Sequence, residues 1–302
     1  MKSKGLGESA EFCSYHPLVN MLYFVLTVGI TMFSISPYFL AVTFLTSWTY
    51  SILLKGKKGI RLNLIMSIVM MVIMVGINMF FNNNGETVLF YINTNRITLE
   101  SICYGIAGAV MLISVIVWFA CFNVIMTADK MIYLFGKAAP VLGLTLSMIF
   151  RFVPLLKSRF AEIVLGQKCM GRGNGQGGLM MKARQLLKEI SILIAWSLEA
   201  SIESADSMEA RGYGLKGRTS FHLFKFSKRD IAMLVFLLAA GLPVAAATVK
   251  GMTGMYFYPK VVMPVVDLQT ALILVCYCLL TASPIIIDIA GEIRWRQLDL
   301  KM

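Results

Sequence analysis

Two arginines stand at the ends of helical patterns in a polar stretch of the chain, where their side chains could bind a partner. Their surroundings read Cys169-Met170-Gly171-Arg172-Gly173 and Met208-Glu209-Ala210-Arg211-Gly212. A guanidinium is planar and always charged, and it binds carboxylates through paired hydrogen bonds. The same pattern also suits a plain helix end, where a glycine takes the left-handed conformation and a cation meets the helix dipole. Partner binding and helix capping therefore both stay open for Gly171, Arg172, Gly173, Ala210, Arg211 and Gly212.

Composition limits the class of protein that carries these motifs. The chain has 302 residues, of which 58% are hydrophobic and 15% are charged, and its mean hydropathy is +0.74. A soluble domain with a polar surface could not support these values, so we expect an all-α integral membrane protein. The net charge of +12 comes mainly from loops and from the polar stretch, as the positive-inside rule predicts. We therefore expect the lipid bilayer, and not nucleic acid, to be a partner of this chain.

Apolar runs predict about six membrane crossings. A cluster of lysines and arginine at 55–61 predicts a cytoplasmic loop, while 82–100 holds a single basic residue and predicts an external one. This assignment places both termini in the cytoplasm. Small residues at 105–109 predict close packing of one span against a neighbour. The predicted spans are 18–35, 37–54, 62–81, 102–126, 231–249 and 265–287.

A further apolar run, 138–156, is not expected to cross. An even number of crossings must separate the two cytoplasmic segments, and three apolar runs lie between them. This run contains Arg151 and two prolines, and an arginine at the bilayer centre costs about 2.5 to 3.5 kcal/mol. We expect a half-embedded or interfacial helix leading into the polar stretch. The chain then divides into 1–137, 138–229 and 230–302.

Two long cytoplasmic helices are predicted in the polar stretch. The first ends at Arg172, and its Arg159 and Glu162 are spaced to pair. The second, about Leu179 to Arg211, would be roughly 50 Å long. Its apolar stripe runs along one face, and an acidic stripe is explained by solvation. The apolar stripe is Leu187, Ile190, Ile194, Leu198 and Ile202, and the acidic residues are Glu199, Glu203 and Asp206.

Motifs for catalysis are absent from the sequence. Two Gly-x-Gly-x-x-Gly matches, 173–178 and 212–217, follow helices instead of strands, and no P-loop sequence occurs. Only two histidines are available, and no cysteine pair has metal-ligand spacing. We expect no enzyme activity, catalytic residue, cofactor or metal site. A stand-alone secondary carrier is the main alternative function, disfavoured because the predicted spans lack internal ionisable groups.

The sequence resembles the T component of energy-coupling factor (ECF) transporters. The resemblance rests on His16-Pro17-Leu18, on Ile97-Thr98-Leu99-Glu100-Ser101, on Ser147-Met148-Ile149-Phe150-Arg151-Phe152-Val153-Pro154, and on the two arginine motifs. It implies a subunit of a bacterial-type cell membrane that links two ABC ATPase subunits to a small membrane S component. In that family the S component binds a vitamin or a transition-metal ion.

The resemblance also implies a role for the paired arginines. Arg172 and Arg211 would lie at the ends of coupling helices, docked in grooves on the two ATPases. The first motif departs from the family pattern, which usually has alanine where Gly171 stands. A glycine there would loosen the last helical turn by about 1 kcal/mol, so we expect Arg172 to be held less firmly than Arg211.

Overall fold

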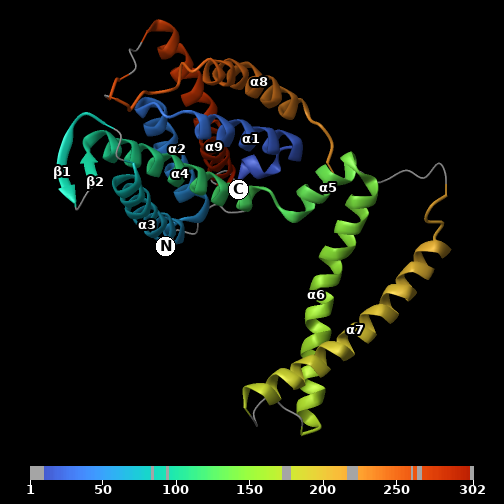
Figure 1. The fold of residues 1–302 in the computed structure, drawn as a ribbon. Coiled ribbons are helices and arrows are strands. Elements are labelled where there is room, and N and C mark those ends of the chain that lie inside the picture. Colours follow the sequence, from blue (N-terminus) through green and yellow to red (C-terminus); the bar gives the residue numbers. More distant parts are fainter. Residues whose placement is uncertain are drawn as a thin grey trace. The chain divides into compact units, whose positions relative to one another are not determined.

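The computed structural model describes residues 10–82, 85–92, 95–171, 178–215, 224–259, 261–263 and 267–299. These residues are almost entirely helical (Figure 1), which confirms the expected all-α fold. The chain forms two compact units. We refer to Met1–Thr127 with Phe224–Met302 as the bundle, and to Ala128–Leu223 as the insert unit.

The bundle contains most of the helices. Its elements are η2 (Glu11–Ser14), α1 (Pro17–Phe33), α2 (Pro37–Lys55), α3 (Lys57–Phe81), β1 (Val88–Ile92), β2 (Asn95–Thr98), α4 (Leu99–Ile125), α8 (Lys228–Val249) and α9 (Leu268–Asp299). The insert unit consists of α5 (Ala128–Ala138), α6 (Pro140–Cys169) and α7 (Leu179–Ala210).

Six helices of the described chain are long and apolar enough to cross a membrane, namely α2, α3, α4, α6, α8 and α9. The number agrees with the expected six, but the set differs. The first predicted span, α1, has 17 residues and is about 25 Å long, less than the roughly 30 Å of a bilayer core. The run at 138–156 instead belongs to α6, which continues to Cys169 with Pro154 in its interior. By length, α6 is long enough to cross the membrane and α1 is too short. The sequence patterns predicted the reverse for these two segments.

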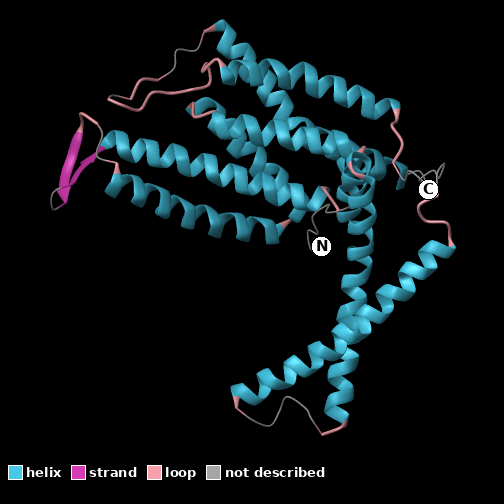
Figure 2. Cartoon of the chain, turned by 45° about the vertical axis from the view of Figure 1, so that its right-hand side comes forward, coloured by secondary structure: helices cyan, strands magenta, loops and turns pink. Residues whose placement is uncertain are grey.

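The structure adds detail to two predicted connections. Within 55–61, α2 and α3 are joined by the single residue Gly56, whose φ of 61° favours glycine and reverses the chain. The segment 82–100 contains an antiparallel hairpin, in which Val88 pairs with Thr98 and Ile92 with Asn95 (Figure 2). The last helix, α9, also extends beyond the predicted end at Ile287 and reaches Asp299.

Aromatic side chains fill the centre of the bundle where α1, α2 and α4 meet. The Trp118 ring lies 5.9 Å from that of Tyr23, 6.0 Å from Tyr50 and 6.2 Å from Phe24. Trp118, Tyr23 and Tyr50 are fully buried. Rings at these separations add to the burial of their large apolar area, so this cluster fixes the three helices against one another.

The small residues of α4 allow α3 to approach closely, as predicted. A Cβ atom added at Gly105 would lie 3.1 Å from the Cα of Val75. Almost any side chain at 105 would therefore push the two helices apart. Ala109 is fully buried on the same helix.

The N-terminal segment closes one end of the bundle. The backbone N–H of Phe12 donates to Oδ1 of Asp288 at 2.7 Å, and the Tyr50 hydroxyl donates to Oδ2 at 3.2 Å. Asp288 belongs to α9 and is buried. The two hydrogen bonds offset the free-energy cost of burying its carboxylate. Arg229, at the start of α8, lies over the Tyr15 ring at 4.4 Å. The segment is thus held by residues from the far end of the sequence.

Candidate partner-binding surface of the insert unit

The insert unit is built on two long crossing helices, α6 and α7 (Figures 1 and 2). The bounds of α7 agree with the predicted helix to within one residue. The C-terminal end of α6 lies beside the start of α7, and the C-terminal end of α7 lies at the opposite end of the unit (Figure 1). With 32 residues, α7 is about 48 Å long, so the C-terminal ends of α6 and α7 are far apart.

The second motif forms a capped helix end around Arg211, the C-cap of α7. Gly212 follows with a φ of 76° and donates its N–H to Glu209 O at 2.8 Å. The Tyr213 N–H donates to Met208 O at 3.0 Å. These two bonds make a Schellman motif, in which the left-handed glycine satisfies the last carbonyls of the helix. The capping interpretation is therefore correct for Gly212, and it leaves the Arg211 guanidinium exposed and without an ion pair to any described residue.

The first motif ends its helix differently. The last residue of α6 is Cys169, and Gly171 takes the left-handed conformation with a φ of 73°. Its N–H donates to Lys168 O at 3.1 Å. The prediction that this helix runs on to Arg172 was wrong, because the glycine that ends it precedes the arginine instead of following it. Arg172 and Gly173 lie outside the described residues.

Residues beyond the second motif extend the C-terminal end of α7, and the sequence patterns did not predict them. Tyr213 and Leu215 are both exposed next to Arg211, 50% and 72% respectively. Gly214 between them has a φ of 90°, so a second left-handed glycine shapes the turn. Arginine and tyrosine are enriched at the energetically dominant positions of protein interfaces. The Gly-Tyr-Gly-Leu sequence was the signal that could have identified the turn.

The predicted apolar stripe of α7 is exposed along its whole length. Leu187 is 67% exposed, Leu198 61% and Ile202 65%, and Ile190 and Ile194 are exposed as well. In contrast, Gln185, Glu189, Leu193 and Trp196 on another face are buried or half-buried. Because α7 uses this second face within the unit, the apolar stripe is left uncovered. A contiguous exposed apolar surface of this kind is typical of an interaction site.

A cation–π contact joins the two helices, and an ion pair lies beside it on α6. The Arg159 guanidinium lies 5.2 Å from the centre of the Trp196 ring and bonds Glu162 at 2.7 Å, which confirms the predicted pair. Glu199, Glu203 and Asp206 are exposed, as expected for solvated acidic residues. Within the described ranges no cluster of metal-ligating side chains occurs.

Comparison with known proteins identifies the relatives of this chain. No family model matches it. A protein of Lactobacillus helveticus described as energy-coupling factor transporter transmembrane protein EcfT is 33% identical over 115 residues, 37% of this chain and 42% of the relative. The chain is similar to ECF transporter T components. The resemblance seen in the motifs is thereby confirmed.

Further EcfT relatives give the same result. The EcfT protein of Streptococcus thermophilus is 34% identical over 114 residues, which cover 37% of this chain and 43% of the relative. The EcfT protein of Streptococcus equi subsp. equi is 27% identical over 190 residues, covering 56% and 69%. The chain thus spans about two fifths of the length of the first two T-component relatives.

Proposed function

We propose that the chain is the transmembrane coupling subunit of an ECF-type ABC importer. It would link two ABC ATPase subunits to a small membrane S component that binds a vitamin or a transition-metal ion. The observation that carries the proposal is the end of α7, where a Schellman turn presents Arg211 to solvent without an intramolecular ion pair. The turn holds the backbone of Arg211, and its exposed guanidinium can form paired bonds with a carboxylate in a partner groove.

Two features of the insert unit support a pair of ATPase contacts. The C-terminal ends of α6 and α7 lie at opposite ends of the unit (Figure 1), and α7 alone is about 48 Å long, so we infer that one small pocket could not hold both arginines. We assign Arg211 to one ATPase and Arg172 to the other. The exposed apolar stripe of α7 is suited to a third, more hydrophobic partner, and we assign it to the S component.

The proposed mechanism is mechanical. When ATP binding closes the two ATPases, the two helix ends move with them, because breaking a buried charge-assisted pair costs several kcal/mol. The helices α6 and α7 contact each other through Arg159 and Trp196, and in this proposal they move as one lever. The displacement reaches the S component through the apolar stripe. The insert unit and both termini are on the cytoplasmic side in this proposal.

Charge reversal at Arg211 tests the proposal. Arg211→Glu places a carboxylate in an acidic groove, and the repulsion and lost paired bonding should cost several kcal/mol of binding. We expect the ATPase subunits to be lost on affinity purification and uptake to fall at least tenfold, with normal membrane insertion. Arg294→Glu is the matched control, because Arg294 is an exposed arginine near the C-terminal end of α9, outside the insert unit.

Two results would contradict the proposal. One is full ATPase capture by a double variant with Arg172→Glu and Arg211→Glu. The other is substrate transport by the purified chain alone in vesicles, which would favour a stand-alone carrier.

A further inference from the structure

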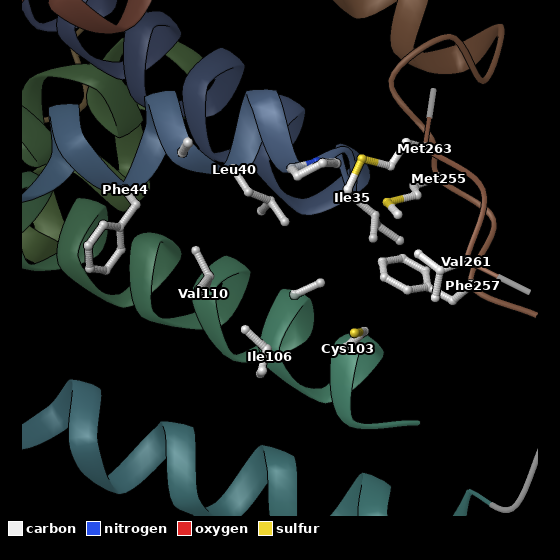
Figure 3. Close-up of a pocket in the computed structure, with 13 residues that line it drawn as sticks. Ile35, Leu40, Phe44, Cys103, Ile106, Val110, Met255, Phe257, Val261 and Met263 are labelled. Atoms are coloured by element: carbon white, nitrogen blue, oxygen red, sulfur yellow. The ribbon is translucent and has the colours of Figure 1, made fainter. Parts of the chain in front are cut away.

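Basic residues gather at one end of the insert unit, where the C-terminal end of α6 lies beside the start of α7 (Figure 1). We refer to 165–171 and 178–188 together as the basic end. Every charged residue in these two ranges is basic, exposed and without an ion pair to any described residue. The pocket of the bundle in Figure 3 is, in contrast, lined by uncharged side chains alone. The basic residues are Lys168 on α6 and Lys182, Arg184 and Lys188 on α7.

The charges of the basic end do not stabilise α7. A helix N-terminus is the positive end of the helix dipole, so acidic residues stabilise it and basic residues weaken it. The first turn of α7 has no acidic residue, and its N-cap Gly178 forms no side-chain hydrogen bond. Lys182 and Arg184 follow within the first two turns, and Lys188 stands four residues after Arg184, a spacing at which like charges repel. Helix stability therefore does not explain this cluster.

Apolar side chains at the basic end are left uncovered. Leu179 is 89% exposed, Met180 86% and Met181 61%. On α6, Leu165 and Met170 are exposed as well. Methionine and arginine are both enriched at protein interfaces, and methionine adapts its shape to a partner. The basic end thus combines unpaired charge with uncovered apolar area, as a binding surface does.

The directions of these side chains favour a concave partner over a membrane surface. A helix that lies on a bilayer keeps its apolar residues on one face and its basic residues on the other. Successive helix residues point about 100° apart, so Leu179, Met180 and Met181 together cover more than half of the circumference. Lys182 and Arg184 are two positions apart and point to nearly opposite sides. A flat surface could meet only one of these sides, whereas a groove could contact several at once.

We propose that the basic end docks in an acidic groove of a partner protein, with Lys182 and Arg184 facing opposite walls. The proposal rests on the proposed function, in which this end meets one of the two ATPase subunits. It adds that the groove carries several carboxylates, in addition to one that pairs with Arg172. These further ion pairs compensate for the first motif, which ends its helix at Gly171, before the arginine.

Charge reversal tests the proposal in the complex purified with its ATPase subunits. Lys182→Glu combined with Arg184→Glu turns two attractions into repulsions. We expect ATPase capture at low salt to fall at least fivefold, and the capture by the unmodified chain to weaken as salt is raised. Lys250→Glu combined with Arg294→Glu is the matched control, because both residues are exposed and lie outside the insert unit. Gel filtration verifies that both double variants are folded.

A photocrosslinking amino acid at Met180 identifies what the basic end contacts in the intact complex. We expect crosslinks to an ATPase peptide rich in aspartate and glutamate, and no ATPase crosslinks from the same probe at Val25, an exposed residue of α1. Crosslinks from Met180 to lipid, to another protein or to nothing would overturn the proposal. So would full capture by folded Lys182→Glu with Arg184→Glu. If Arg211→Glu still abolished capture, the proposed function would stand and only the acidic groove would be wrong.

Discussion

The backbone N–H of His16 donates a hydrogen bond of 3.1 Å to the side chain of Asp230, 214 residues further along the chain. His16 caps α1 through its Nδ1, which accepts from the Leu18 N–H, and its ring stacks on Phe226 at 3.8 Å. Asp230 at the same time forms the capping box of α8 with Ser227. One buried carboxylate therefore joins the starts of two helices, and it follows directly after the segment that leaves the insert unit.

The first prediction concerns this carboxylate. Asp230→Ala removes the capping box and leaves the buried His16 N–H without an acceptor, so we expect a loss of about 2 to 4 kcal/mol in the free energy of unfolding. Asp230→Asn keeps an acceptor and should lose less than half as much. Unfolding in detergent, followed by near-UV circular dichroism, measures both. Equal losses for the two variants would show that the hydrogen bonds are not the cause.

The second prediction concerns the turn after Arg211. In Gly212→Ala the added Cβ meets both a φ of 76° and the Leu215 side chain at 2.9 Å, and the left-handed conformation alone costs about 1 to 2 kcal/mol. We expect faster amide exchange in the last turn of α7 and weaker capture of ATPase subunits. Gly178→Ala is the control, because Gly178 has a φ of −69° and open space around it. Unchanged exchange in Gly212→Ala would mean that the Schellman turn is dispensable.

The third prediction concerns Glu189, which is 1% exposed in the insert unit. Its Oε1 accepts from Gln185 at 3.4 Å, and its Oε2 has no hydrogen-bond partner among the described residues. Since a buried carboxylate with an unsatisfied oxygen is destabilising, Glu189→Leu should stabilise the insert unit by about 1 to 2 kcal/mol. Glu199→Leu, at an exposed acid of the same helix, should have no such effect. Thermal unfolding distinguishes them, and a lower melting temperature for Glu189→Leu would assign this carboxylate a supporting role.

The fourth prediction concerns membrane orientation. In a chain without its six native cysteines, a cysteine at Arg96 should react with an impermeant maleimide added outside the cell, because 82–100 is predicted to be external. A cysteine at the exposed Val141 should react only after permeabilisation, since α6 carries the exposed Arg151 and is predicted not to cross. External labelling of Val141 would establish α6 as a crossing helix and remove the six-span arrangement.

Local patterns were enough to predict much of this fold. The ends of α7 were placed to within one residue because glycines flank an unbroken amphipathic pattern. Close packing at Gly105 followed from the small residues of one helix. The pair of Arg159 and Glu162 followed from their spacing alone. Each of these features depends on residues near one another in sequence.

Other features depend on choices that local sequence does not encode. Both Gly171 and Gly173 could have ended α6, and only the structure distinguishes them. The single-residue turn at Gly56 looked like a longer loop because lysines surround it. The bond between His16 and Asp230 joins residues more than 200 positions apart, and nothing near either residue predicts the other. Likewise, the uncovered stripe of α7 reflects which face packs on α6.

The bond from Phe12 to Asp288 also sets an order for biogenesis. Phe12 is among the first described residues to leave the ribosome, yet its acceptor lies 276 residues later, in α9. Until translation reaches α9, neither the Phe12 N–H nor the Tyr50 hydroxyl has its native acceptor, the Asp288 carboxylate. Closure of this end of the bundle is therefore a late event, after the insert unit and α8 have been synthesised. A nascent chain arrested before Asp288 would present an unfinished end, which membrane quality-control proteases could recognise.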